Sequence, residues 1–302
     1  MKTNFDNIDT FLIWLYLFID DLFQQTELPL YTMRLSNNQE PYFTDVELFT
    51  CAIFTEIVGC NNKKHGHRYL KQHYFAWFPK LPSYEVYNRK LDKYHEALTY
   101  MFKMLRNRLT MPQPVIAQID TAPIVVCQQQ HIAKADAARP VVAVGYCASK
   151  KEFYRGVKLQ LITLKRDTLL PLPIDYTIEA ASVHDLEIAK QTLPYSDLEN
   201  SDLYGDKAYI DADFQLELFE TKGINLITPT KKQKGQPEFT LFQKAYNAIH
   251  SSIRQPIDTL FGWINDQTHI ENASKVRSIN GLFYHINVKM VAALLLLMFS
   301  FN

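Results

Sequence analysis

The pattern that most restricts the fold lies between residues 111 and 230, where short apolar segments of two different periods follow one another. The run "MPQPVIAQID" (111–120) is bounded by prolines and rich in β-branched residues. Residues 154–180 hold two alternating apolar segments joined by the turn-like sequence Lys165-Arg166-Asp167. Alternation with period two, interrupted by turn residues, predicts a strand followed by a β-hairpin.

Helix and strand signals then alternate. In chain order they are a helix at 182–193 capped by Ser182 or His184, a strand ending at Gly205-Asp206, a helix closed by Gly223, and a strand at 224–230. Helical patterns fill the chain from about residue 240 to the end. Strand, hairpin, helix, strand, helix, strand and further helices are typical of an α/β domain in which helices cover a mixed sheet.

The first 110 residues differ, because they contain helical patterns and no strand pattern. One predicted helix begins with the capping pair Thr44 and Glu47 and stops at Gly59. Three or four short helices with basic residues between them suit a DNA-docking module, although small helical bundles without that function look the same. We therefore expect an all-α domain at residues 1–110 and an α/β domain at 111–302.

The charge distribution is informative where the total is not. The chain has 32 basic and 32 acidic residues, so its net charge argues for no particular partner. Between positions 51 and 110, however, Lys and Arg clearly outnumber Asp and Glu, and Lys63, Lys64 and Arg68 lie close together. This excess predicts a phosphate-binding face, and the alternative is an ordinary solvated helical surface.

Several classes of protein are disfavoured. The four cysteines (Cys51, Cys60, Cys127 and Cys147) lack paired metal-ligand spacing, and no secretory signal is evident, so we expect reduced thiols and a cytoplasmic protein. His65-Gly66-His67 is expected to be a loop and not a zinc site. The most apolar stretch (290–299) is too short to cross a bilayer and predicts a buried core helix.

Three acids are candidates for chemistry. Asp120 and Asp206 each end a predicted strand, where open α/β sheets place functional residues. Either one alone could be only a helix cap. Together with Asp258 on a later helix they form a carboxylate set of the kind that binds Mg²⁺ or Mn²⁺ for phosphoryl transfer.

The segment "SSIRQPIDTLFGWI" (251–264) predicts the helix that carries Asp258, with Pro256 near its start. Inside a helix, proline would remove a hydrogen bond and kink the axis, whereas at the first position it would begin a new helix. In the second case Asp258 falls at the third position, where the helix dipole favours a carboxylate without any metal.

Five segments in register resemble the catalytic domain of DDE-type transposases of bacterial insertion sequences. They are "IDTAPIVVC" (119–127), "GYCASKKEFYRGVKLQLIT" (145–163), "LYGDKAYI" (203–210), "GINLITPT" (223–230) and "THIENASKVRS" (268–278). The resemblance covers about residues 110–300, and the helical leader is similar as well. It implies an RNase H-like fold, a divalent-metal site of two aspartates and a glutamate, and cleavage and joining of double-stranded DNA by a homodimer.

Carried over by position, the resemblance assigns Asp120 and Asp206 as the first two metal ligands. The family's tyrosine–arginine–glutamate–lysine signature falls on Ser251, Arg254, Asp258 and Asn265, so only the arginine is retained and the acid is one methylene shorter. Glu271 is an alternative acid outside the usual site. The residues expected to contact DNA are Arg254, Lys207, Lys150, Lys151, Arg155, Lys63, Lys64 and Arg68.

Three functions remain open at this point. The first is a transposase that uses Asp120, Asp206 and Asp258 with Mg²⁺ or Mn²⁺. The second is a decayed transposase that only binds DNA, and the third is a metal-dependent nuclease without strand transfer. His184-Asp185 is expected to be a helix start, and Tyr209 and Trp263 are expected to pack in the core.

Overall fold

The computed structural model describes residues 4–5, 7–34, 42–60, 62–109, 115–128, 138, 140–147, 150–232 and 234–301. The first four residues of the predicted run 111–120 therefore lie outside the described residues. The chain forms two compact units, which are described separately. One comprises Met1–Arg108 and Ile264–Asn302, and the other comprises Leu109–Trp263.

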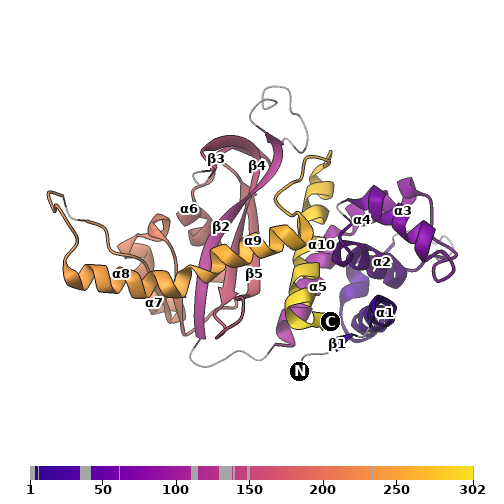
Figure 1. Cartoon of the computed structure of the whole chain (residues 1–302), viewed down its shortest axis with the longest axis horizontal. Helices are drawn as coiled ribbons and strands as arrows, with labels where there is room; N and C mark the ends of the chain where they lie inside the picture. The colour runs from indigo at the N-terminus through magenta and orange to yellow at the C-terminus, as the bar shows by residue number, and fades with distance from the viewer. Residues whose placement is uncertain are drawn as a thin grey trace. The chain divides into compact units, whose positions relative to one another are not determined.

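The unit Leu109–Trp263 is built on a six-stranded mixed sheet (Figure 1). Its strands are β2 (Val115–Gln128), β3 (Ala143–Cys147), β4 (Glu152–Leu164), β5 (Leu172–Ala180), β6 (Ser201–Tyr204) and β7 (Ile224–Ile227). The order is β3-β4-β2-β6-β7, and β5 also pairs with β4. β2, β3 and β5 are antiparallel to β4, whereas β6 and β7 continue the sheet in parallel from β2.

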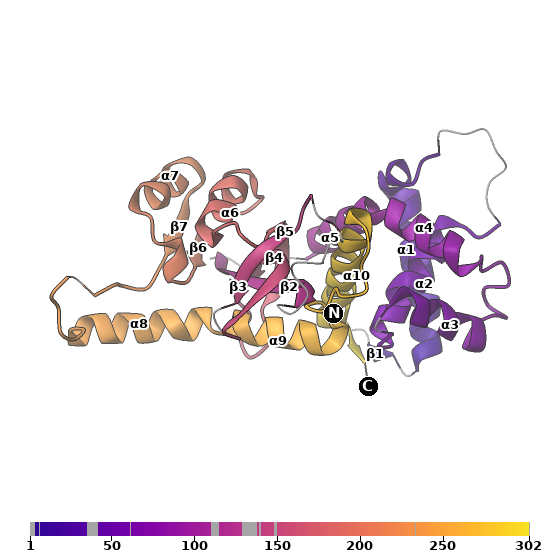
Figure 2. The ribbon, with the colours of Figure 1, turned by 90° about the horizontal axis from the view of Figure 1, so that it is seen from above.

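Helices cover both faces of this sheet. They are α6 (Asp185–Thr192), α7 (Ala212–Lys222), α8 (Leu241–Arg254) and α9 (Pro256–Thr268). Figure 2 shows α6 and α7 on one face, with α8 and the start of α9 along the other. This arrangement confirms the expected RNase H-like mixed sheet flanked by helices. The predicted hairpin is β4 and β5, and the predicted caps His184 and Gly223 flank α6 and α7.

Two features of the sheet differ from the sequence prediction. Asp120 lies inside the long strand β2 and does not end it, because β2 continues to Gln128 as the partner of β4. The parallel neighbour β6 stops level with Gln118, so Asp120 lies just beyond the point where the pairing of β2 with β6 ends. The strand β3 was not predicted, since its five residues carry no distinctive alternation of polar and apolar types.

The second unit is helical. It contains α1 (Ile8–Gln25), the 3₁₀ turn Leu28–Tyr31, α2 (Asp45–Ile57), α3 (Lys63–His73), α4 (Tyr84–Lys93), α5 (His95–Asn107) and α10 (Ile279–Met298), with the short parallel pair β1 (Asn4–Phe5) and β8 (Ser300–Phe301). The predicted capping box starts α2: the Glu47 backbone N–H donates to Thr44 Oγ1 at 3.1 Å, and the Thr44 N–H donates to Glu47 Oε2 at 2.7 Å. His65-Gly66-His67 was predicted as a loop and is instead part of α3, where Gly66 packs against Thr55.

The C-terminal helix α10 is the centre of this helical unit. Its Lys289 Nζ lies 2.5 Å from Glu56 Oε2 of α2, and Asn287 Nδ2 donates to the His95 carbonyl at 3.0 Å. Residues 264–302 thus pack with the N-terminal helices, whereas the sequence division placed them with the sheet. In the described part of the chain, α10 alone has the length and apolarity of a membrane span, but 72% of its apolar window is buried inside the protein. It is the core helix that the sequence predicted.

Candidate functional site

Two parallel strands bring the first two acids to one level of the sheet. β2 pairs with β6 from Val115 opposite Ser201 to Gln118 opposite Tyr204. The same offset of 86 positions, continued for two residues, places Asp120 level with Asp206. Because β6 ends at Tyr204, Asp206 lies in the crevice beyond the strand end, which is where α/β sheets carry their functional groups.

Gly205 makes the exit from β6 possible. A Cβ atom at this position would lie 2.9 Å from the Tyr209 ring and 3.2 Å from Cγ2 of Ile119, so any other residue would force these side chains apart. Asp206 then caps the short 3₁₀ turn Lys207–Tyr209, accepting the backbone N–H of Ala208 at 2.7 Å through Oδ1. The carboxylate is therefore held in place by the backbone of the turn that it caps.

A single guanidinium joins the first and third acids. Arg254 Nη1 lies 2.6 Å from Asp120 Oδ2, and Arg254 Nη2 lies 2.5 Å from Asp258 Oδ2. The other Asp120 oxygen, Oδ1, accepts the backbone N–H of Thr121 at 2.8 Å. The planar fork of arginine can donate to two carboxylates at once, which the point charge of lysine does less well. Residues 134 positions apart in the chain are brought together in this way.

The surroundings of Asp120 keep its proton unusually tightly bound. Burial raises the pKa of Asp120 to about 7, although the Arg254 cation and the Thr121 N–H oppose this rise, and the nearby Asp258 and Asp206 carboxylates add to it. A carboxyl group that titrates near neutrality, beside two other acids at a strand-end crevice, is typical of a functional site.

Pro256, in the segment 251–264 that carries the third acid, is the first residue of helix α9. α8 ends at Arg254, the cap residue Gln255 keeps helical backbone angles, and α9 begins at Pro256. Asp258 is thus the third residue of α9 and lies one turn beyond Arg254, with 49% of its side chain exposed. The Arg254 cation stabilises its charge.

Two buried glutamines beneath the acids had no signal in the sequence. Gln118 Nε2 donates to the Ile253 carbonyl at 2.6 Å, and its Oε1 accepts the Thr163 hydroxyl at 2.7 Å, so Gln118 links β2 to the residue before Arg254. Gln160 Nε2 lies 3.3 Å from the hydroxyl of Tyr209, which is fully buried as predicted. Gln118 fixes the backbone before Arg254, whereas Gln160 holds the Tyr209 side chain, whose ring packs beside Gly205. Neither occurs in a motif, because their partners are distant in the chain.

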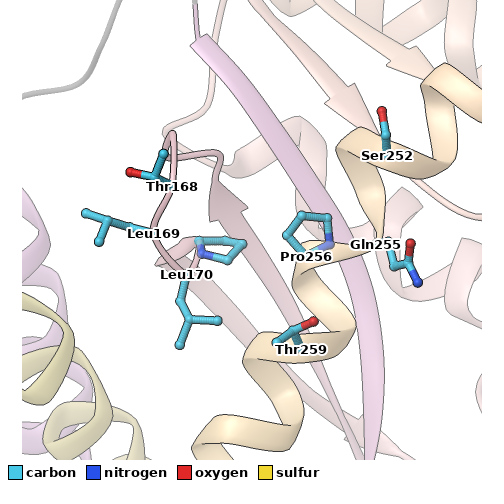
Figure 3. Close-up of a pocket in the computed structure, with 8 residues that line it drawn as sticks. Thr168, Leu169, Leu170, Ser252, Gln255, Pro256 and Thr259 are labelled. Carbon is cyan, nitrogen blue, oxygen red and sulfur yellow. The ribbon is translucent and has the colours of Figure 1, made fainter.

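A cavity of about 350 Å³ opens beside Asp206 and Arg254. Its lining residues are Asp206, Lys207, Pro229, Asn247, His250, Ser251 and Arg254. A second cavity of about 430 Å³ lies between the β4–β5 turn and the junction of α8 and α9, where Ser252, Gln255 and Thr259 line it from the helices (Figure 3). The second cavity has no charged residue in its lining, whereas the lining of the first combines the acid Asp206 with the cations Lys207 and Arg254.

The donor chemistry of the three acids suits a divalent metal, because carboxylate oxygens are the ligands that Mg²⁺ prefers. In this conformation, however, no three acidic, histidine or cysteine side chains within the described residues converge closely enough to hold an ion. Arg254 supplies the positive charge between Asp120 and Asp258. The acids therefore fit a metal in type, and Arg254 would have to move for Asp120 and Asp258 to share one.

The basic residues expected to contact DNA have unequal surroundings. Lys63 is largely buried in an ion pair with Asp92 and lies 4.8 Å above the Tyr284 ring. Lys64 and Arg68 are exposed on α3 in the helical unit. In the unit with the sheet, Lys207, Lys150 and Lys151 are exposed, and Arg155 is half-buried on β4.

The remaining candidate residues lie away from the three acids or have contacts that explain them structurally. His184 caps α6, and Asp185 pairs with Lys158 at 2.7 Å. Glu271 belongs to the helical unit, so it is not part of the compact unit that carries Asp120 and Asp206. Trp263 is half-buried, less than a core position would be.

Comparison with known families agrees with this geometry. The family model described as "Transposase DDE domain" matches residues 112–295, which is more than half of the chain. Comparisons with curated proteins and with solved structures gave no match. The matched range starts just before β2 and continues into α10, so it contains Asp120, Asp206, Arg254 and Asp258. The chain belongs to the transposase DDE-domain family.

Proposed function

We propose that this protein is a transposase that cuts double-stranded DNA at the ends of an insertion sequence and joins the freed 3′-hydroxyl to target DNA, with Asp120, Asp206 and Asp258 as its catalytic acids. The observation that supports this most directly is the Arg254 bridge, since it gathers Asp120 of β2 and Asp258 of α9 at the strand end where Asp206 lies. We further propose that it acts as a homodimer in the bacterial cytoplasm, because joining two ends needs two active sites.

Asp120, Asp206 and Asp258 would hold Mg²⁺ or Mn²⁺ in this proposal. When bound, the ion supplies Lewis-acid activation of the phosphodiester and of the attacking water or 3′-hydroxyl. The residues of the chain position the DNA. Lys207 at the mouth of the charged cavity contacts a phosphate, and the Arg254 fork matches a phosphate as well as it matches a carboxylate. When a DNA phosphate takes the guanidinium, Asp120 and Asp258 would lose their internal counter-charge, and their carboxylate oxygens would then be free to hold the ion.

One observation favours a second candidate, a protein that binds DNA without cutting it. Asp258 is one methylene shorter than the glutamate of the family signature, and its carboxylate is already paired with Arg254. If Arg254 never releases this carboxylate, the metal site stays incomplete while the basic surface still binds DNA. A third candidate, a nuclease without strand transfer, uses the same acids.

The test is Mg²⁺- or Mn²⁺-dependent nicking of a supercoiled plasmid that carries the DNA flanking the coding sequence on both sides. We expect cleavage by the wild type, loss of cleavage in Asp120→Asn and Asp258→Ala, and full activity in the control Asp213→Asn, which changes an exposed acid of α7. Cleavage that persists in Asp120→Asn would refute the assignment.

The same assay separates the three candidates. Cleavage only in Asp258→Glu identifies a disabled enzyme that retains DNA binding. Cleavage by the wild type without joining of a labelled 3′-hydroxyl end to a second DNA molecule identifies a nuclease. Joining that depends on Asp120, Asp206 and Asp258 supports the transposase.

A further inference from the structure

The ribbon formed by β3 and the first part of β4 presents an apolar, aromatic outer face. Register pairs Tyr146 with Phe153 and Val144 with Arg155. The Tyr146 and Phe153 rings are 5.0 Å apart between centroids, and the two side chains are 52% and 50% exposed. Large aromatic side chains that stay half exposed on a strand pair, next to each other, are unusual for a surface without a partner.

The inner face of the same ribbon is fixed against the sheet. Tyr154 is buried between the two outward-facing residues Phe153 and Arg155. Gly156 packs so closely on β2 that a Cβ atom there would lie 1.9 Å from the Ile124 carbonyl oxygen. Because the inner face has no freedom to rotate outward, the aromatic pair stays on the outer face.

Basic side chains surround the aromatic pair. Lys150 and Lys151 are exposed next to the start of β4, and Arg155 follows Phe153 on the same face, whereas Glu152 is the only acid in the described part of the ribbon. Arg155 Nε is buried and has no hydrogen-bond partner among the described residues. The ribbon therefore combines two stackable rings with an excess of positive charge.

We propose that this ribbon binds unpaired nucleotides of DNA, with Tyr146 and Phe153 stacking on bases and Lys150, Lys151 and Arg155 contacting the adjoining phosphates. Every base has an aromatic face, so such a surface is tolerant of sequence, and the cations follow the backbone. Bases in an intact duplex are stacked on each other, so this surface distinguishes frayed or single-stranded ends from blunt ones. The proposal rests on the function proposed above, because it assigns the ribbon to the DNA that the three acids cut.

The charge around the rings argues for nucleic acid as the occupant. A second copy of the chain would have to place an acidic surface against Lys150, Lys151 and Arg155, whereas every DNA strand carries a negative phosphate at each nucleotide. Arg155 lies on the same face as the rings, so its guanidinium is within reach of the nucleotide that stacks on Phe153. The binding surface is thus defined by one strand pair.

The experiment measures equilibrium binding of fluorescein-labelled DNA by anisotropy in EDTA, which prevents cleavage, at one fixed salt concentration. The probes are a blunt duplex, the same duplex with three unpaired nucleotides at its end, and a twelve-nucleotide single strand. The variants Phe153→Leu and Tyr146→Leu keep an apolar side chain and remove the ring. Tyr195→Leu is the matched control, because Tyr195 is 86% exposed in the same unit and outside the ribbon.

We expect the wild type and Tyr195→Leu to bind the frayed duplex and the single strand more tightly than the blunt duplex. Each ribbon variant should lose this preference by about 5-fold or more, the loss expected when one stacking contact is removed. Binding of the blunt duplex should stay unchanged.

Equal affinity of the wild type for blunt and frayed duplexes overturns the ribbon proposal and leaves the proposed function intact. The same holds if the ribbon variants alter only the oligomeric state measured by light scattering. Failure of the wild type to bind any of the three probes overturns the proposed function together with the ribbon.

Discussion

The buried ion pair between Glu56 and Lys289 allows a quantitative test of how the C-terminal helix is anchored. The two side chains are 6% and 1% exposed, and Lys289 Nζ also lies 2.5 Å from the Thr268 carbonyl oxygen. Lys289→Met keeps the length of the side chain and removes its charge. Glu56 then remains in the core without a counter-ion, and the Thr268 carbonyl loses its donor.

Breaking a buried pair by removing one partner costs about 3–5 kcal/mol, because an uncompensated charge stays behind. In a domain of this size, each kcal/mol corresponds to a Tm change of about 2–4 °C, so the variant should unfold about 6–20 °C below the wild type. The assay is thermal unfolding followed by circular dichroism at 222 nm. The control Lys71→Met changes an exposed lysine of α3 and should shift Tm by no more than about 2 °C.

The pH dependence of stability tests whether the unpaired charge of Glu56 causes the loss in Lys289→Met. Burial raises the pKa of Glu56, and the Lys289 cation is the strongest influence that lowers it again. Without that cation the folded-state pKa of Glu56 rises further above its unfolded value near 4.5. A carboxyl group whose pKa is higher in the folded state stabilises the protein at pH values below its unfolded-state pKa. This stabilisation is lost as pH rises through the folded-state pKa. The deficit of Lys289→Met should therefore be larger at pH 8 than at pH 5.

The double variant Glu56→Gln with Lys289→Met removes both charges and isolates their interaction. It should recover a large part of the lost Tm and lose most of the additional pH dependence. A Lys289→Met deficit that is the same at pH 5 and pH 8, or a double variant less stable than Lys289→Met, would refute the argument from the unpaired Glu56 charge.

Two further predictions concern single residues. Burial, and then the Lys289 cation, lowers the pKa of His285 to about 3, so the folded protein binds fewer protons than the unfolded chain between pH 6.5 and 3. The free energy of unfolding, measured with urea, should fall as pH drops below 6.5, by at most about 2 kcal/mol at pH 5. His285→Gln can still donate to the Ile270 carbonyl and should make this free energy less dependent on pH. Gln118→Leu removes the hydrogen bonds to Ile253 and Thr163 and should cost about 1–3 kcal/mol in urea unfolding and lower the cleavage rate, while frayed-end binding by the ribbon stays unchanged.

Local sequence patterns predicted the elements well wherever the signal and the structure lie within one turn or one strand. Thr44 and Glu47 sit three residues apart and form the capping box that was expected. The period-two segments around Lys165-Arg166-Asp167 form the β4–β5 hairpin. These signals depend on backbone geometry that neighbouring residues determine by themselves.

The position of Asp120 shows where such reasoning fails. Pro123 follows three residues later, and a proline normally argues against the interior of a strand. Here β2 has already lost its parallel neighbour β6, which stops opposite Gln118, so at Pro123 the strand pairs, among the described residues, with β4 alone. A proline is tolerated where one side of the strand is free. That information belongs to the register between two strands and is absent from either segment.

The anchoring of α10 was inaccessible for a related reason. Its apolar sequence predicted a buried helix but not the partner on which it is buried. That partner is identified by Lys289 and Glu56, which are 233 positions apart, and a lone lysine in an apolar helix has no signal for its counter-ion. The sequence boundary near residue 110 agrees with one edge of the compact units, and the other edge near 263 follows from this contact.

The presence of an acid at position 258 has two explanations, and they require different contacts. As the third residue of α9, Asp258 occupies a first-turn position at which a helix dipole favours an acid, and this explanation needs neither Asp120 nor Arg254. The second explanation is the Arg254 fork, which requires an acid one turn beyond the arginine and a second acid on β2. Gln118 holds the Ile253 carbonyl beside Arg254, and the Thr121 N–H holds Asp120, so the arginine and the acid on β2 are each fixed by groups that the dipole does not need. The start of a helix does not require this alignment across the sheet, whereas the pairing of Arg254 with both Asp120 and Asp258 does.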